Sequence, residues 1–403
     1  MEICPSDKCT CCAACQNICP HDGISMKENQ YGELHPEVDK TKCKNCTLCI
    51  NICPVNNQPV FNYPSLCYAS WITDIKKRRI CASGGIGTVM AEYVINKLNG
   101  ITYGSRYDDN LTPIMTSANT VEQLERFKGS RYVQSIVSNT TYKEVLANIK
   151  SGKEVLFIGT PCQIAGLKAY VKNDYENLIT VDLICHGCAP TEYFNKEVKY
   201  ICQRNKLSGI TDIRFRGNDN YNYCFSFWKN NGENNHYEYM ERASESYYLS
   251  GFLLGVTLRE NCYSCSYARP ERISDITIGD FIGLGQQVPF DHSTTNVSSV
   301  MINTEKGKSF YDGMSKNTPE LINVVRNYQE RLVYKPSLTK PSTRHKLNSI
   351  FREEYLRNGY TTAIRKTLGG YVRRQKAKRI ISLPWQVARL VWTNAKRIVS
   401  NVW

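Results

Sequence analysis

The sequence has no long hydrophobic run. None of its segments approaches the roughly 18–20 consecutive apolar residues that a helix needs to span a bilayer, and no signal peptide precedes the first cysteine motif. These absences argue against a membrane-spanning or secreted protein. We expect a cytoplasmic protein whose only membrane contact would be peripheral, at the inner face of the plasma membrane.

Acidic residues are missing from the C-terminal segment, although the whole chain carries a net charge of +14. Residues 361–403 contain no Asp or Glu, so most of the excess positive charge lies there. The basic residues of this segment are Arg365, Lys366, Arg373, Arg374, Lys376, Lys378, Arg379, Arg389, Lys396 and Arg397.

The same segment also contains apolar residues on both sides of Pro384. They are Ile380, Ile381, Leu383, Trp385, Leu390, Trp392, Val399 and Trp403. This pattern predicts two short amphipathic helices, which suit peripheral contact with an anionic membrane. The alternative is a helical arm that packs on a partner subunit or on its own domain. The chain lacks a zinc-finger spacing, and its basic tail and cysteine motifs lie at opposite ends, so we expect no nucleic-acid partner.

Cysteine is abundant, with 19 residues, and the first group forms a repeat. Short CxxC spacings without a secretory context indicate a reducing compartment and metal binding rather than disulfides. The repeated motif is CxxCxxCxxxCP, and soft iron prefers thiolate ligands in this spacing. A pair of zinc knuckles is the alternative, but zinc does not call for this doubled run. The motif cysteines are Cys9, Cys12, Cys15, Cys19, Cys43, Cys46, Cys49 and Cys53.

In two-cluster ferredoxins the fourth cysteine of each motif binds the other cluster. The repeat therefore predicts two [4Fe–4S] clusters with crossed ligand sets. One set is Cys9, Cys12, Cys15 and Cys53, and the other is Cys43, Cys46, Cys49 and Cys19. Cys4 and Cys11 lie outside the motif, and we interpret them as spare thiols.

A second domain is predicted to begin near Ser65, after a linker rich in Asn and Pro at residues 54–64. Short apolar runs then alternate with amphipathic stretches, which is typical of βαβ units and of a mixed or mainly parallel sheet. The predicted strands are residues 67–72, 155–158, 178–184 and 276–279, and the predicted helices are residues 88–98, 163–171 and 193–203.

Two turns in this domain are candidate anion sites. One opens a helix, where glycines let backbone N–H groups approach a phosphate, and the other places two cations around a tight turn. A turn without a ligand and a solvated basic turn are the respective alternatives. The first comprises Ser83, Gly84, Gly85, Gly87 and Thr88, and the second comprises Lys128, Gly129, Ser130 and Arg131.

Four further cysteines, Cys162, Cys185, Cys262 and Cys265, lie at predicted strand ends and in loops. If these loops meet at the carboxyl edge of the sheet, where α/β folds place their sites, they could hold a third [4Fe–4S] cluster. Buried free cysteines are the alternative. Asp280, also at a strand end, is an acid or base, the cap of the following turn, or the partner of a neighbouring arginine.

Four segments resemble, in the same order, motifs of the coenzyme F420 hydrogenase/dehydrogenase beta-subunit family. They are residues 128–132 (KGSRY), 159–163 (GTPCQ), 182–187 (DLICHG) and 275–281 (DITIGDF). The likeness spans roughly residues 65–300, and a ferredoxin-type extension before this domain is a known family arrangement. Ile282, Cys188 and Cys81 depart from the usual family residues, which is consistent with a different substrate or cluster environment.

The resemblance implies a flavin, usually FAD, beside a [4Fe–4S] cluster. It implies Cys162, Cys185, Cys262 and Cys265 as the cluster ligands. It implies the two turns at residues 83–88 and 128–131 as the flavin contacts. A flavin exchanges one or two electrons and therefore connects iron–sulfur clusters to hydride chemistry.

The predicted fold is α+β: a two-cluster ferredoxin-type module (1–60), an α/β flavin domain in two parts (65–150 and 151–335) and a basic amphipathic helical tail (336–403). The predicted protein is a flavin-dependent oxidoreductase that passes electrons between the ferredoxin-type clusters, a further cluster, a flavin and a reducible or hydride-accepting substrate. Its expected partner is a soluble electron carrier or a redox subunit. The alternative is a non-catalytic subunit that delivers electrons to a partner enzyme, linked to polysaccharide synthesis.

Overall fold

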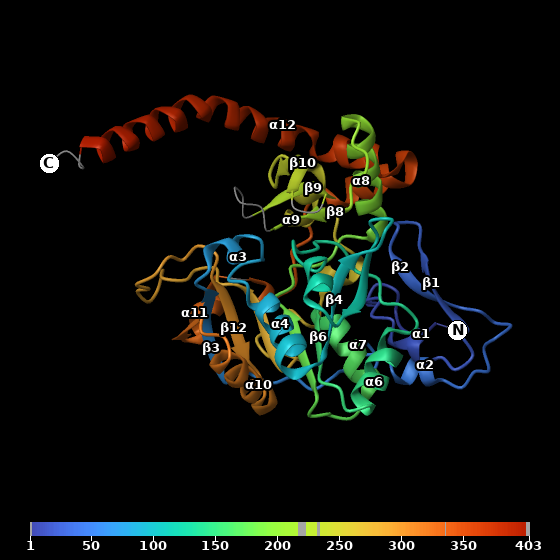
Figure 1. The fold of residues 1–403 in the computed structure, drawn as a ribbon. Coiled ribbons are helices and arrows are strands. Elements are labelled where there is room, and N and C mark those ends of the chain that lie inside the picture. The colour runs from blue at the N-terminus through green and yellow to red at the C-terminus, as the bar shows by residue number, and fades with distance from the viewer. Residues whose placement is uncertain (1, 217–222, 232–233, 335, 400–403) are drawn as a thin grey trace.

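The structure is a computed structural model (Figure 1), and it describes residues 2–216, 223–231, 234–334 and 336–399. For residues 230, 231, 234–236 and 382–399 it describes the backbone alone. The described chain forms an N-terminal module, a large mixed sheet covered by helices on both faces, and a smaller layer above the sheet.

The two halves of the N-terminal module fold alike, as the repeated motif predicts. Each half has a short helix that begins inside its motif, α1 (Ala14–Ile18) and α2 (Leu48–Asn51), and the residues just before them, Ala13 and Thr47, have φ angles of 62° and 60°. The antiparallel strands β1 (Ile24–Glu28) and β2 (Leu34–Val38) form the hairpin between the motifs. The left-handed residues let the chain turn so that the cysteines on either side face one centre.

The large sheet has eight strands in the order β13-β3-β12-β11-β7-β6-β4-β5. Strands β11, β7, β6 and β4 are parallel to one another, and the remaining pairs are antiparallel, so the sheet is mixed. The strands are β3 (Leu66–Ile72), β4 (Ile101–Tyr107), β5 (Pro113–Ala118), β6 (Val155–Gly159), β7 (Leu178–Leu183), β11 (Ile276–Asp280), β12 (Ser298–Ile302) and β13 (Leu321–Arg326).

Helices cover both faces of this sheet. On one face α4 (Ile86–Leu98) and α10 (Glu305–Lys316) share a hydrophobic core with the strands. On the other face lie α6 (Thr141–Lys150), α7 (Pro161–Val171) and the N-terminal module, which share a second core. Shorter elements complete the domain: α3 (Ile75–Arg79), α5 (Val121–Glu125), α11 (Tyr328–Val333) and the 3₁₀ turns Glu260–Ser264 and Pro336–Leu338.

The predicted strands at 67–72, 155–158, 178–184 and 276–279 correspond to β3, β6, β7 and β11, and these predictions are confirmed. The predicted helices at 88–98 and 163–171 correspond to α4 and α7, and the third to α8 (Thr191–Asn205). Residues 65–150 and 151–335 both contribute strands to the one sheet, since β3 pairs with β12 and β13, and β4 pairs with β6.

The smaller layer consists of a three-stranded sheet and the helices around it. Its strands are β8 (Asp212–Arg214), β9 (Cys224–Asn231) and β10 (Asn234–Arg242), in the order β10-β9-β8. An aromatic core that includes Phe194, Phe215 and Tyr248 joins this sheet to α8, α9 (Tyr247–Leu253) and the start of α12 (Asn348–Val399). The layer lies above the carboxyl edge of the large sheet (Figure 1).

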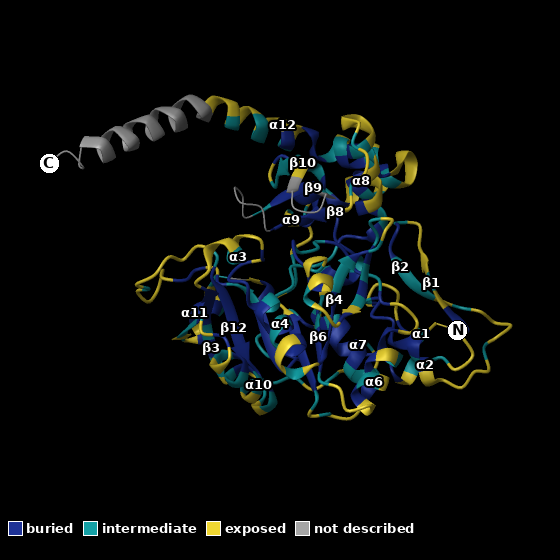
Figure 2. Ribbon diagram, viewed as in Figure 1, coloured by how far each residue is buried: buried dark blue, intermediate teal, exposed yellow. Residues whose placement is uncertain are grey.

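The predicted division of the C-terminal segment into two helices at Pro384 is wrong. Helix α12 continues through this position, and its non-helical residue is Gly359, with φ 72° and ψ 174°. Glycine alone adopts this conformation readily, so the break falls there. The helix begins as part of the fold, because Phe351, Ile364 and Leu368 are buried in the aromatic core, and it becomes exposed further along (Figure 2).

Most of the apolar residues predicted to lie on the tail helices fall where the structure describes the backbone alone. Leu383, Trp385, Leu390, Trp392 and Val399 lie among residues described by backbone alone, as do Arg389, Lys396 and Arg397, and Trp403 lies outside the described residues. Among the helices that are described, none combines the length and the apolar character that crossing a membrane requires.

Candidate functional site

The eight cysteines of the repeated motif line two separate cavities in the N-terminal module. We call these cavities the inner and the outer thiol site. The structure brings Cys53 to the first motif and Cys19 to the second, which is the crossed arrangement that the sequence predicts. The inner site is lined by Cys9, Cys12, Cys15 and Cys53, and the outer site by Cys19, Cys43, Cys46 and Cys49.

The inner site is buried and crowded with sulfur. All four of its motif cysteines are buried, and two residues outside the motif, Cys4 and Cys11, also line it. Burial, together with the neighbouring Cys12, raises the pKa of the Cys15 thiol above its ordinary range. So many buried thiols cannot all ionise without a compensating positive charge, which the iron ions of a cluster would supply.

No three His, Cys, Asp or Glu side chains within the described residues converge closely enough to hold a single metal ion. The donor set at both sites consists of thiols spaced around a cavity, and a [4Fe–4S] cluster takes one thiolate at each iron corner. The residues present therefore fit a cluster at each site.

The four further cysteines meet in one cavity of about 340 Å³ at the carboxyl edge of the large sheet. We call it the central cavity. Cys162 follows β6, Cys185 follows β7, and Cys262 and Cys265 come from the 3₁₀ turn Glu260–Ser264 and its end. Cys188, a departure from the family pattern, lines the same cavity. The loops therefore meet where parallel strands end, as α/β folds arrange their sites.

Local structure holds these thiols in place. Cys162 lies in the first turn of α7, where Thr160 and Gln163 form a capping box. The backbone N–H of Gly187 donates to Cys185 Sγ at 3.3 Å, and that of Cys188 donates to Cys262 Sγ at 3.4 Å. Burial, and then Cys185, raises the pKa of the Cys162 thiol to about 12. These thiolates, like those of the inner site, require a nearby cation, and a [4Fe–4S] cluster fits the donor set.

All the predicted flavin contacts except Gly84 line the same central cavity, and the glycines of the first turn differ in role. A Cβ on Gly84 would lie 2.2 Å from the carbonyl oxygen of Ser70 and 2.9 Å from the backbone nitrogen of Ser298, so this glycine is required for packing. A Cβ on Gly87 would meet only Ile278 Cδ1, at 3.4 Å. Gly87 and Thr88 are in the first turn of α4, whose free N–H groups favour an anion.

The second turn uses its two cations internally. Lys128 Nζ pairs with Glu125 at 2.5 Å. The Arg131 guanidinium donates to the carbonyl oxygen of Phe127 at 2.9 Å and also to those of Lys128 and Arg126. Both cationic groups are thus engaged in holding the turn. Gly129 and Ser130, which also line the cavity, have φ angles of 94° and 58°.

Asp280, which the sequence singles out, borders the central cavity at the end of β11 with two partners that the sequence does not reveal. Arg216 makes a two-point contact with Asp280, at 2.8 and 3.1 Å, and Tyr223 donates to the same carboxylate at 2.5 Å. Although burial opposes ionisation, Arg216 holds the pKa of Asp280 below its ordinary value. The structure thus supports the arginine-partner reading of Asp280.

Two fully buried arginines stand beside the cysteines, and no motif predicts them. Arg272, which lines the central cavity, pairs through Nη2 with Asp182 at 3.0 Å. Arg259 donates to Gln134 Oε1 at 2.8 Å and to the carbonyl oxygen of Cys9 at 3.2 Å. Isolated arginines carry no recognisable spacing, so only the folded arrangement shows that they place positive charge near the thiols.

The inner site and the central cavity share a wall. Cys11 lines both cavities. Tyr142 donates through its hydroxyl to the carbonyl oxygen of Cys12 at 2.8 Å and to that of Gln163 at 3.0 Å, and a Cβ on Gly166 of α7 would lie 2.9 Å from Cys12 Cβ. The first motif is therefore packed directly against the helix that carries Cys162.

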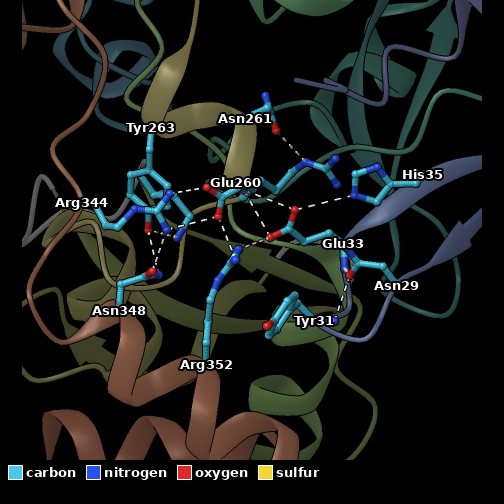
Figure 3. A network of polar contacts seen from close by, with 12 residues as sticks. Asn29, Tyr31, Glu33, His35, Glu260, Asn261, Tyr263, Arg344, Asn348 and Arg352 are labelled. Atoms are coloured by element: carbon cyan, nitrogen blue, oxygen red, sulfur yellow. Dashed lines mark hydrogen bonds and ion pairs between the residues drawn. The ribbon is translucent and has the colours of Figure 1, made fainter. Parts of the chain in front are cut away.

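An ion network centred on the buried Glu33 fixes this junction from a second side (Figure 3). Glu33, at the end of the β1–β2 turn, accepts hydrogen bonds from the backbone N–H of Glu260 at 3.2 Å and from Arg352 Nη2 at 2.6 Å. Arg352 also contacts Glu260 at 2.8 Å, and Arg344 pairs with the same glutamate. The network ties the N-terminal module to the turn that carries Cys262 and to the start of α12.

Comparisons with known proteins agree with this division of the chain. Residues 152–324 match the family that represents the C terminus of the coenzyme F420 hydrogenase/dehydrogenase beta subunit, and residues 8–57 match the family described as 4Fe-4S dicluster domain. The solved structures include a similar chain of the F420-reducing [NiFe] hydrogenase complex from Methanosarcina barkeri, with 16% identity and a TM-score of 0.44 over 77% of this chain and 92% of that chain. A search of curated proteins finds no match.

Proposed function

We propose that the protein is a flavin-dependent iron–sulfur oxidoreductase, because residues 152–324 match the model for the C terminus of the coenzyme F420 hydrogenase/dehydrogenase beta subunit and residues 8–57 match a 4Fe–4S dicluster domain. One observation carries the proposal. The outer site, the inner site and the central cavity follow one another, and the central cavity contains both the four further cysteines and the two candidate flavin turns.

The proposed ligand sets follow the cavities. The two ferredoxin-type clusters take the crossed sets of the inner and outer sites, and a third cluster takes Cys162, Cys185, Cys262 and Cys265. When bound, the clusters supply one-electron steps, and a flavin supplies the conversion to two-electron chemistry on a reducible or hydride-accepting substrate.

The flavin, proposed to be FAD, is assigned to the wall formed by the start of α4 and the turn at residues 128–131. The N-terminal N–H groups of α4 near Gly87 and Thr88 would hold a phosphate group. The turn would contribute the backbone of Gly129 and Ser130, since the side chains of Lys128 and Arg131 are already bonded within the protein. The sequence predicts that Lys128 and Arg131 contact the flavin, and we propose instead that their side chains shape the turn.

The buried Arg259 has a defined electrostatic role in this proposal. Each added electron makes a buried thiolate-bound centre more negative, which is costly in a medium of low dielectric constant. Arg259 lines the central cavity and donates to the carbonyl oxygen of Cys9 at the inner site. Its positive charge would stabilise the reduced state of both sites, whereas the charge of Arg272 is balanced by its buried partner Asp182.

We place the protein in the cytoplasm, with a soluble electron carrier or a redox subunit as its partner. The exposed basic residues Arg373, Arg374 and Lys378 on α12 support a peripheral contact with an anionic membrane. Three other basic residues of this segment are engaged in ion pairs, namely Arg365 with Glu197, Lys366 with Glu354 and Arg379 with Glu245.

The test is anaerobic purification followed by quantification of iron, sulfide and flavin. Three clusters and one flavin predict about twelve irons and one flavin per chain. About eight irons without flavin would contradict the oxidoreductase and support the alternative, an electron-transfer subunit that serves a partner enzyme. Turnover with soluble acceptors separates the two functions further, because only the oxidoreductase carries its own substrate site.

A further inference from the structure

The outer thiol site is the part of the proposed electron path that reaches the surface. Cys46 is exposed, and Cys19 and Cys43 are half-buried, whereas all four motif cysteines of the inner site are buried. We infer that the face around the outer site is the docking surface for an acidic electron-carrier protein. The inference rests on the proposed function and specifies where its partner binds and what charge that partner carries.

Positive charge surrounds this site. Lys40, Lys42 and Lys44 are all exposed, and Lys44 lines the outer site itself. None of the three forms an ion pair within the described part of the chain. Their ammonium groups are therefore available to carboxylates of another protein, and three like charges close together attract an acidic surface over about 10 Å at moderate salt.

The acidic residues of this face are already engaged. Asp39 accepts hydrogen bonds from the backbone N–H and the hydroxyl of Thr41, at 2.9 and 2.7 Å. Glu37 pairs with Lys27, and Asp22 lies 3.9 Å from Lys143. The hydrogen bonds from Thr41, and then Lys42, lower the pKa of Asp39, so this carboxylate keeps its negative charge beside Lys42. Three lysines against this one carboxylate leave the face around the outer site positive.

An apolar contact lies at the centre of the charged face. Leu48, on α2, is 41% exposed and lines the outer site next to Cys49. A small apolar centre excludes water where two redox centres approach, and surrounding charges steer and orient the partner. This combination suits a brief encounter with a carrier better than a permanent apolar interface.

The transfer itself needs no further reactant. A cluster held by Cys19, Cys43, Cys46 and Cys49 would accept one electron from the reduced carrier, which would become oxidised. No bond forms or breaks, and no proton has to move. The residues of the docking face only bring the two centres together.

The experiment compares the wild type with Lys42→Glu/Lys44→Glu and with a matched control, Lys97→Glu/Lys316→Glu. The control makes the same change in net charge at exposed lysines of α4 and α10, away from the N-terminal module (Figure 1). Reduced flavodoxin, a small acidic carrier, serves as the probe. Stopped-flow mixing gives the bimolecular rate of cluster reduction at several salt concentrations, and titration with oxidised flavodoxin gives the Kd.

At low salt we expect Lys42→Glu/Lys44→Glu to be reduced up to about tenfold more slowly than the wild type, with a weaker salt dependence and a raised Kd. The reduction rate of the control variant should change by less than about twofold. Reduction by dithionite, a small reductant, should be the same in all three proteins. Equal effects of the two variants, or none, would overturn the inference. Failure of the proposed function would differ from this, because the wild type would then purify with about eight irons and without flavin. Lys42→Gln/Lys44→Gln should give an intermediate rate.

Discussion

At the residue scale, two glycines of the turn at residues 83–88 are needed for different reasons, one for packing of the sheet and one for the proposed ligand. Gly84 leaves room for β3 and β12, because any Cβ there would meet the backbone of the paired residues Ser70 and Ser298. Gly87 has open space towards the central cavity apart from Ile278. The first glycine therefore serves the sheet, and the second serves the proposed ligand.

We predict that Gly84→Ala and Gly87→Ala separate these requirements. Gly84→Ala should lower the free energy of unfolding by about 3 kcal/mol or more, because backbone atoms cannot move aside cheaply. Gly87→Ala should keep its iron and its Tm but bind flavin about tenfold more weakly, since the methyl group narrows the wall beside α4. Thermal unfolding and flavin titration measure the two effects. An unchanged flavin Kd in Gly87→Ala would remove this turn from the flavin site.

Glu197 on α8 gives a residue-scale prediction about pH. This carboxylate is 1% exposed and faces Arg365 at 3.1 Å, with Tyr360 and Glu241 also nearby. Burial, partly offset by Arg365, raises the pKa of Glu197 to about 7. Because the folded state then holds this proton more tightly than the unfolded state, the group stabilises the fold below pH 4.5 and loses this contribution as pH rises towards 7.

The variant Glu197→Gln removes that titration. Its stability relative to the wild type should rise by about 2 kcal/mol between about pH 5.5 and about pH 8. The measurement is the difference in Tm between variant and wild type across this range, with Glu353→Gln, at an exposed glutamate, as the matched control. A constant difference for Glu197→Gln would show that Arg365 keeps the carboxylate ionised throughout.

At the scale of elements, the sequence predicts the buried parallel strands well and the smaller layer poorly. Strands β6, β7 and β11 are short apolar runs with polar or glycine residues at their ends, and they were predictable within one residue. The three-stranded sheet depends on packing between distant segments, such as Phe215 against Phe225 and Tyr248. Sequence patterning does not reveal such long-range contacts, so it predicts helix α8 of this layer but not the three-stranded sheet.

Helix α12 shows the same limit at its break. Proline signals a helix boundary in sequence, yet the helix bends at Gly359, whose φ of 72° and ψ of 174° are open to few residues other than glycine. A side chain at Gly359 would meet nothing within 4 Å. The requirement for glycine there is therefore conformational rather than steric.

We predict opposite effects for two glycines of this helix. Gly359→Ala should destabilise the protein by about 1–3 kcal/mol, because alanine is strained in this conformation. Gly370→Ala should stabilise it by up to about 1 kcal/mol, because Gly370 is exposed, helical and without neighbours within 4 Å of an added Cβ. Denaturation midpoints of the two variants test this. If both changes stabilise the protein, the break at Gly359 is not required by the fold.

At the scale of the whole molecule, the junction between the N-terminal module and the large domain determines how the three thiol sites follow one another. The motif spacings predict which cysteines gather, and the structure brings the same sets together. The motif spacings do not predict the junction, because it is formed by Arg259, Tyr142 and the residues of the Glu33 network. These residues come one by one from distant parts of the chain. Only the fold shows that the first motif lies against the helix that carries Cys162.

The most direct test of the account is whether electrons reach the flavin through the central cysteines. The wild type and Cys162→Ala are mixed anaerobically with a reduced carrier protein. The carrier is too large to enter the central cavity of about 340 Å³. Cys265→Ala serves as a second variant in case Cys162→Ala loses its flavin. We predict that the flavin absorbance bleaches in the wild type, whereas in the variants the ferredoxin-type clusters are reduced and the flavin stays oxidised. Bleaching of the flavin at the wild-type rate in both variants would contradict the proposed path.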